Sequence, residues 1–264
     1  MSVDTAPDTA SAPARPGGRP GMASPLDPNR RIRAVLFDLD GTLYDQRRMR
    51  TLMAMELAAM LLRRPFQAPR DLRTLAAFRK AQESLRDGHG SRSGPAAQLE
   101  EAAARLRMPL AEVEAVTTEW MMERPLKHME RCRAAGTIEL LAALHARGIE
   151  MGVLSDYPAA AKLHALGIAS SFSVVLCTTD PEIGAFKPDP RGFLAAADRW
   201  QLPPAEVLMV GDRADADAAG AAAAGMPCVI IGRSQAVPAG ASGFRLIPSL
   251  ERLRNVLDDD HRGH

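Results

Sequence analysis

Short apolar runs recur along the chain from residue 31 onward, and each ends at polar residues or glycine. The runs cover residues 34–37, 149–154, 174–177, 207–210 and 228–231, with a possible sixth at 244–247. Most are rich in Val, Ile, Leu and Met and too short for helices, which is typical of strands buried on both faces of a parallel sheet. Helical patterns separate the later runs, at 138–147, 159–166, 190–200 and 215–224. This alternation predicts an α/β fold with a doubly wound, Rossmann-like parallel sheet.

The long interval between the first two runs contains no strand candidate. Its helical patterns are broken by Pro65, by a glycine-rich stretch and by Pro109. The four patterns cover residues 49–64, 68–86, 96–107 and 110–123. We therefore expect a discontinuous core, residues 31–46 and 135–257, that carries an inserted α-helical cap, residues 47–134.

The two ends of the chain differ from the rest in composition. Residues 1–30 are dominated by Pro, Ala, Gly, Ser and Asp with scattered arginines. Such a segment buries too little apolar surface to offset the entropy of ordering, so we expect a disordered tail. Residues 258–264 are predicted to be a short polar tail.

Overall composition excludes several classes of protein. The 264 residues carry a net charge of +1, with 46% hydrophobic and 25% charged residues. This balance gives no sign of a nucleic-acid or membrane-surface partner, and no apolar run approaches the roughly 20 residues of a membrane helix. The start lacks the basic and apolar regions of a signal peptide, and the three cysteines (Cys132, Cys177 and Cys228) have no CxxC spacing. These features favour a cytoplasmic protein without a disulfide framework or a zinc site.

Candidate chemistry gathers where the predicted strands end. Asp38 and Asp40 follow the first run, Ser155 and Asp156 the second, and Asp212 and Asp217 the fourth, while Lys187 precedes a helix. In an open α/β sheet, ligands bind beyond the carboxyl ends of the strands. Crowded carboxylates repel one another unless a cation joins them, and oxygen ligands suit Mg²⁺. The pattern therefore predicts a Mg²⁺ site at this edge.

Four motifs in order resemble those of the haloacid dehalogenase-like superfamily of phosphohydrolases. They are the DxDGT motif at 38–42, Ser155 after an apolar strand, Lys187 followed by Pro188, and the GDxxxxD motif at 211–217. The resemblance covers residues 31 to about 232. The helical insertion resembles the cap of the phosphoglycolate phosphatase-like subfamily.

The resemblance implies a mechanism for the reacting groups. Asp38 would be the nucleophile that forms an aspartyl-phosphate, and Asp40 would be general acid and then general base. Mg²⁺ would be held by the Asp38 carboxylate, the Asp40 backbone carbonyl and Asp212, with Asp217 in support. Lys187 would offset the repulsion between the nucleophile and a phosphate dianion.

The resemblance also implies how the phosphate is bound. Ser155 would donate a hydrogen bond to it, joined by Lys187 and by backbone N–H groups near Leu39 and Asp156. A lid over the nucleophile disfavours bulky substrates, so we expect a small phosphorylated metabolite as substrate. The protein would be a monomer or a homodimer.

Two other functions remain open from the sequence. A phosphoglucomutase-like phosphotransferase shares the DxD motif, and a non-catalytic binding protein could use the same fold. Dehalogenases and phosphonoacetaldehyde hydrolases of the superfamily lack the second aspartate, so Asp40 argues against both.

Several side chains have structural interpretations beside the functional ones. Asp156 is interpreted as a helix N-cap, and Asp215 as a cap or surface residue. The stripe of Met49, Met53, Leu57 and Met60 is interpreted as core packing rather than a substrate wall. Further residues with an open role are Arg213 after the GD pair, Arg47, Arg48 and Arg50 after the first motif, and His89 and Arg92 as candidate substrate contacts.

Overall fold

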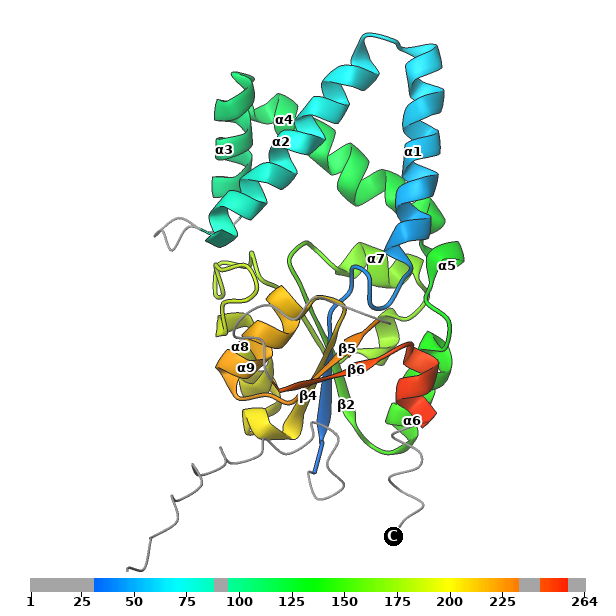
Figure 1. The fold of residues 1–264 in the computed structure, drawn as a ribbon, viewed down its shortest axis with the longest axis vertical. Helices are drawn as coiled ribbons and strands as arrows, with labels where there is room; N and C mark the ends of the chain where they lie inside the picture. Colours follow the sequence, from blue (N-terminus) through cyan, green and yellow to red (C-terminus); the bar gives the residue numbers. More distant parts are fainter. Residues whose placement is uncertain (1–30, 88–94, 233–242, 256–264) are drawn as a thin grey trace, which may run out of the picture.

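One parallel sheet of six strands forms the centre of the described chain (Figure 1). The structure is a computed structural model, and it describes residues 31–87, 95–232 and 243–255. The strands are β1 (Ala34–Phe37), β2 (Glu150–Ser155), β3 (Val174–Cys177), β4 (Val207–Gly211), β5 (Cys228–Ile231) and β6 (Phe244–Ile247). Their order is β3-β2-β1-β4-β5-β6, as in a doubly wound sheet. The chain adds strands outward from β1 to β3, and then from β4 to β6 on the other side of β1. The predicted fold class is confirmed, and the sixth candidate run is a strand. Both predicted tails lie outside the described residues.

Strand β1 lies in the middle of the sheet, between β2 and β4. Phe37 is in register with Val153 on one side and Val210 on the other. The next residue, Asp38, continues the pairing, because its backbone N–H donates to the Val210 carbonyl at 2.8 Å. The carboxyl ends of the three central strands therefore lie at one level.

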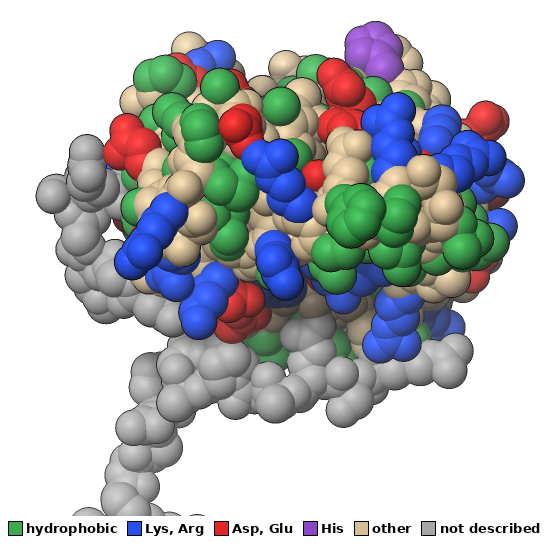
Figure 2. Space-filling model, turned by 90° about the horizontal axis from the view of Figure 1, so that it is seen from above, with side chains coloured by type: hydrophobic (Ala, Val, Ile, Leu, Met, Phe, Trp, Pro, Cys, Tyr) green, Lys and Arg blue, Asp and Glu red, His purple; other side chains and the backbone are tan. Residues whose placement is uncertain are grey.

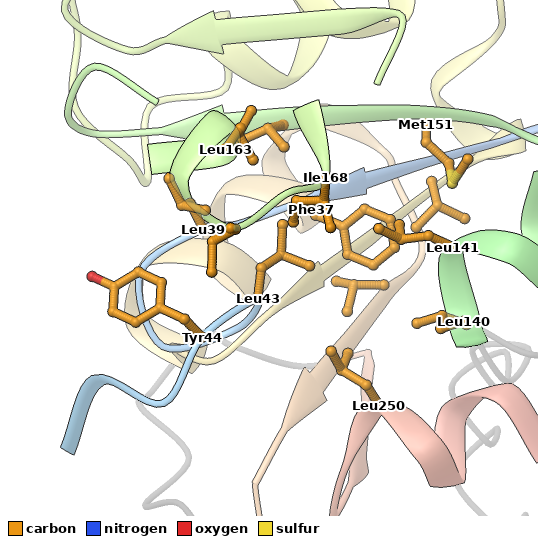
Figure 3. Packing of buried hydrophobic residues seen from close by; sticks show 14 of the residues in the cluster. Phe37, Leu39, Leu43, Tyr44, Leu140, Leu141, Met151, Leu163, Ile168 and Leu250 are labelled. Atoms are coloured by element: carbon orange, nitrogen blue, oxygen red, sulfur yellow. The ribbon is translucent and has the colours of Figure 1, made fainter. Parts of the chain in front are cut away.

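Helices cover both faces of the sheet. Helices α6 (Thr137–Ala146) and α7 (Ala160–Ala165) lie on one side, and α8 (Arg191–Trp200) and α9 (Ala219–Ala224) on the other (Figure 1). Successive residues of β1 point to opposite faces, so Phe37 packs in one hydrophobic cluster and Leu36 in the other. Figure 3 shows the first cluster, in which Tyr44 lies at the edge with its hydroxyl directed away from the apolar side chains.

The helices between β1 and β2 form a separate group above the carboxyl ends of the strands (Figure 1). We call this group, residues 46–132, the helical insert. Its elements are α1 (Gln46–Arg63), α2 (Gln67–Asp87), α3 (Pro95–Leu106), α4 (Leu110–Thr117), η1 (Thr118–Glu123), η2 (Arg124–His128) and α5 (Met129–Cys132). It has two apolar clusters of its own, around Phe78 and around Trp120.

The helix expected over 110–123 changes type at Thr118. Residues Thr118–Glu123 form a π-helix, and Arg124–His128 a 3₁₀-helix. The Thr117 hydroxyl donates to the carbonyls of Val113 and Glu114, both at 3.0 Å. These carbonyls are acceptors of the regular α-helical ladder, so the side chain competes with it where the helix changes.

The outer surface of the insert is mixed in character. Figure 2 shows it from above, with Lys and Arg side chains spread over it and hydrophobic side chains gathered on the right, the side of α1 in Figure 1. In the second half of α1 and just after it, Met55, Leu62 and Phe66 are largely exposed. Among the described residues, no helix has both the length and the apolar character needed to span a bilayer.

Replacing Phe193 tests the packing of α8 on the sheet. Phe193 is fully buried in the second cluster, and its ring lies against Gly220 of α9, where an added Cβ would overlap it. We expect Phe193→Ala to lower the free energy of unfolding by about 3–5 kcal/mol, measured by urea denaturation, because it leaves a cavity between α8 and the sheet. Leu194→Ala is the matched control, since Leu194 is 38% exposed and should cost much less. Equal losses for the two variants would contradict this packing.

Candidate active site

A cavity of about 550 Å³ lies at the carboxyl ends of the strands, between the sheet and the helical insert. Residues from both parts of the chain line it. Those that the sequence predicted as site residues are Asp38, Asp40, Asp156, Lys187, Asp212 and Asp217. The structure therefore gathers residues up to 179 positions apart, from 38 to 217, in one place.

Lys187 lies at the centre of the ionic contacts. Its Nζ is 2.5 Å from Asp38 Oδ1 and 2.7 Å from Asp217 Oδ1, and all three side chains are buried. Burial by itself would lower the pKa of the Lys187 ammonium, but Asp217 and Asp38 raise it above its usual value. The lysine therefore stays charged and balances part of the acidic charge.

Three carboxylates of this site approach one another closely enough to share a cation. Oxygen atoms of Asp38, Asp212 and Asp217 all lie within 4.8 Å of one another. Burial raises the pKa of Asp38, and burial together with Asp217 raises the pKa of Asp212 to about 6. Asp38 Oδ2 is buried without a hydrogen-bond partner among the described residues. A donor set made only of oxygen, with one atom unsatisfied, fits a hard divalent cation.

Two glycines allow the carboxylates to come this close. Gly41 has a φ of +105°, and a Cβ added there would overlap the carboxylate of Asp212. Gly211 is packed against Asp217 in the same way. Glycine in the two motifs thus leaves room for the acidic side chains as well as for the turn after β1.

Asp217 also organises the loop after β4. Its Oδ2 accepts hydrogen bonds from the backbone N–H groups of Asp212 at 3.2 Å and Arg213 at 3.0 Å. The side chain therefore fixes the backbone on which Asp212 stands, while its other oxygen binds Lys187. Arg213 pairs with the exposed carboxylate of Asp215, which has the surface role considered for it.

The expectation that Asp156 caps a helix is wrong. Helix α7 begins at Ala160, and its N-cap residue is Ala159. Asp156 Oδ1 instead accepts from Thr178 Oγ1 at 3.0 Å and from the backbone N–H of Lys187 at 3.2 Å. It therefore braces the segment that carries Lys187, a contact that depends on the neighbouring strand β3.

Asp40 has two partners that the sequence reasoning missed. Lys162 Nζ lies 2.6 Å from Asp40 Oδ1, and the Tyr44 hydroxyl donates to the same oxygen. Burial opposes ionisation of Asp40, but Lys162 and Tyr44 lower its pKa below the usual value. Burial and the nearby Asp40 charge raise the pKa of Tyr44, which keeps it a donor. The only signal in the sequence was the rarity of lysine, with four among 33 basic residues.

Two predicted phosphate-binding residues are completely buried and do not line the cavity. Ser155 ends β2, and its hydroxyl accepts from the backbone N–H of Tyr157 at 3.2 Å. The Leu39 side chain packs in the first hydrophobic cluster. Their role in binding phosphate stays a prediction. His89 and Arg92 lie outside the described residues.

The methionine stripe of α1 contributes to both the core and the cavity. Met49 and Met60 are buried in hydrophobic clusters, as core packing predicts, and Met49 also lines the cavity. Met53 and Leu57 are half-buried and line the cavity, and so does Arg50, which donates to Gln46 at 2.7 Å.

The fold and this cluster together are those of an enzyme with a parallel α/β sheet and a group of carboxylates around a lysine at its edge. The chain belongs to the haloacid dehalogenase-like hydrolase family, whose family model matches residues 32–225. The resemblance found in the sequence is thereby confirmed.

Individual relatives agree with this assignment. The chain is 30% identical over 238 residues to a glyceraldehyde 3-phosphate phosphatase of Methanopyrus kandleri. The aligned region covers 86% of this chain and 96% of the relative. The chain is 31% identical over 218 residues to a phosphoglycolate phosphatase of Salmonella typhimurium, covering 77% of this chain and 82% of the relative. A solved structure of a phosphatase of the family from Thermococcus onnurineus has a TM-score of 0.59 and 25% identity, covering 86% of this chain and 98% of the other.

The pairing of Lys162 with Asp40 can be tested through stability. We expect Lys162→Met to lower the free energy of unfolding by about 3 kcal/mol at pH 7, because it leaves the Asp40 carboxylate without its cation. Burial would then raise the pKa of Asp40. Protonation removes the uncompensated charge, so the difference from the wild type should shrink as the pH falls to about 5.

Lys80→Met is the control, since Lys80 is exposed on α2 and its loss should change stability by about 0.5 kcal/mol at most. Urea denaturation at the two pH values measures all three proteins. A loss of stability in Lys162→Met that does not change with pH would contradict the pairing.

Proposed function

We propose that this protein is a Mg²⁺-dependent phosphatase that hydrolyses a small phosphorylated metabolite through an aspartyl-phosphate on Asp38. One observation carries the proposal: the Asp38 carboxylate and the Lys187 ammonium are in contact in the same cavity as Asp40. The relatives named as phosphatases support a phosphoric monoester hydrolase.

Asp38 acts first, as the nucleophile. An oxygen of its carboxylate attacks phosphorus, the bond between phosphorus and the leaving oxygen breaks, and the alcohol departs. An anionic nucleophile and a phosphate dianion repel each other, and the Lys187 ammonium, 2.5 Å from Asp38, lowers that repulsion. Asp156 supports this step indirectly, because it holds the backbone of Lys187.

Asp40 moves the protons. It gives a proton to the leaving oxygen, and then takes one from the water that attacks phosphorus and releases Asp38 and inorganic phosphate. Lys162 and Tyr44 keep Asp40 ionised in the structure, the form needed for the second step. A bound phosphate dianion opposes the negative charge of Asp40, which favours the protonated form needed for the first.

The residues that would hold Mg²⁺ are Asp38, Asp212 and the backbone carbonyl of Asp40, with Asp217 in support. When bound, the metal supplies positive charge against the phosphoryl oxygens. We assign phosphate binding to Ser155, Lys187 and the backbone near Leu39 and Asp156, which would place hydrogen-bond donors around the phosphate.

We also propose that residues 47–134 act as a cap on the core formed by residues 31–46 and 135–257. The cavity between the two parts would hold the substrate and keep water away from the aspartyl-phosphate until hydrolysis. A cytoplasmic location and a monomeric or homodimeric state remain predictions.

Replacing the nucleophile tests the proposed reaction. We expect Asp38→Asn to abolish phosphate release from p-nitrophenyl phosphate in the presence of Mg²⁺, because an amide does not form the phosphoenzyme. A chelator should abolish the activity of the wild type. Asp45→Asn is the matched control, since Asp45 is the exposed N-cap of α1 and asparagine caps equally well.

The products decide between hydrolysis and phosphotransfer. Substantial phosphate release by Asp38→Asn would contradict the assignment of the nucleophile. When a sugar monophosphate is supplied as substrate, formation of a sugar bisphosphate in place of free phosphate would identify a phosphotransferase instead.

A second variant tests the two roles of Asp40. We expect Asp40→Asn to release about one equivalent of p-nitrophenolate in a rapid burst, followed by slow turnover. The good leaving group needs no proton in the first step, whereas the second step still lacks its base. Stopped-flow absorbance measures the burst, with Asp38→Asn as the control that should show none. Linear release at the wild-type rate would contradict the base role of Asp40.

A further inference from the structure

The walls of the cavity differ sharply from its floor. The floor carries the aspartates and Lys187, whereas the side formed by the insert is mainly apolar. The apolar side chains that the insert contributes include Met53 and Leu57 of α1, Leu75 of α2, and Trp120 and Met121 of η1.

This apolar wall is held in place by contacts behind it. Met53, Leu57 and Leu75 pack against the cluster that contains Trp120. The Trp120 indole N–H donates to the buried carboxylate of Asp71 at 3.0 Å, and the Arg124 guanidinium lies 4.4 Å from the centre of the ring. The indole is thus fixed on its edge and on one face, so the wall exists before a ligand arrives.

Few polar groups of the insert are available to a leaving group rich in hydroxyls. Gln46 is engaged by Arg50. Gln82 Oε1 accepts from the Tyr157 hydroxyl at 2.8 Å, which leaves the buried Gln82 Nε2 as a donor without a partner among the described residues. Arg79 and Glu83, which also line the cavity, are exposed and opposite in charge. A polyol on this wall would exchange hydrogen bonds to water for contacts with thioether, alkyl and indole groups, which is unfavourable.

Size points in the same direction. A cavity of about 550 Å³ lies within the range that encloses ligands far larger than a two-carbon or three-carbon phosphate ester. A small polar substrate would leave much of the apolar wall uncovered, whereas an apolar ring would remove that surface from water.

We propose that the substrate of this site is a phosphomonoester with an apolar, ring-sized leaving group that packs against Met53, Leu57, Leu75 and Trp120. The inference rests on the phosphatase function proposed above and adds the class of substrate. It separates this chain from relatives named for glyceraldehyde 3-phosphate and phosphoglycolate, whose leaving groups are small and polar.

A series of primary alkyl phosphates tests this class. Ethyl, butyl and benzyl phosphate are compared with phosphoglycolate by phosphate release in the presence of Mg²⁺, with Asp38→Asn as the blank. All four are esters of primary alcohols, so the comparison varies the size and polarity of the leaving group far more than its bond to phosphorus. We expect kcat/KM to rise along the alkyl series, with benzyl phosphate at least about tenfold above ethyl phosphate and above phosphoglycolate.

A wall variant then locates the preference. Leu57→Gln keeps the size of the side chain but places an amide on the wall, so we expect it to lower the benzyl-to-ethyl ratio of kcat/KM about tenfold, mainly through KM for the benzyl ester. Leu61→Gln is the matched control on the same helix, because Leu61 is 47% exposed and does not line the cavity. It should leave the ratio unchanged.

The outcomes separate the two proposals. Phosphate release that is equal across the series, or fastest with phosphoglycolate, overturns the inference and leaves the phosphatase function standing. No release from any of the four esters or from p-nitrophenyl phosphate overturns the proposed function and the inference with it. If Leu57→Gln does not fold, the series measured on the wild type decides alone.

Discussion

The site depends on balancing several negative charges in a place that water reaches poorly. Asp38 and Asp217 are buried around one lysine, and that lysine contacts both of them. Removing an ion from water costs several kcal/mol, so such a group persists only where each charge meets an opposite charge or a hydrogen-bond donor. The surrounding structure supplies these partners: Asp217 accepts from backbone N–H groups, and Asp156 holds the backbone of Lys187. Asp38 Oδ2 has no hydrogen-bond partner among the residues that the structure describes, which leaves this oxygen available to a ligand.

Much of the fold could be predicted because buried parallel strands have a signature that is local in the sequence. Apolar runs such as 34–37 and 207–210 are strands, and the residues that follow them reach one edge by topology alone. Contacts that depend on three-dimensional packing could not be predicted. Lys162 reaches Asp40 from α7, and Asp156 meets Thr178 across a neighbouring strand, so neither partner is visible from spacing.

The stripe on α1 shows a different reason for incomplete prediction. Its apolar residues repeat at helical spacing, and that spacing is the same whether the stripe meets another helix or an open cavity. Met60 and Leu57 pack in the same cluster, but of the two only Leu57, on the preceding turn, also lines the cavity. Spacing along α1 does not separate the two roles, because they depend on how the cluster around Trp120 packs α1 against α2 in three dimensions. A hydrophobic pattern therefore predicts that a helix face is buried, but it does not predict whether another helix or a cavity lies against that face.

The two segments that join the helical insert to the core run side by side. Tyr44 pairs with Arg133 in an antiparallel bridge, and the Asp45 N–H donates to the Cys132 carbonyl at 2.7 Å while the Ala134 N–H donates to the Leu43 carbonyl at 3.0 Å. The chain therefore leaves the core and returns to it through one paired stem. An insert that joins the core through one such stem can be replaced, lengthened or shortened during evolution while the order of the strands in the core stays the same. The edge of the sheet that carries the aspartates and the surface that the insert turns toward it can then diverge at different rates within one lineage.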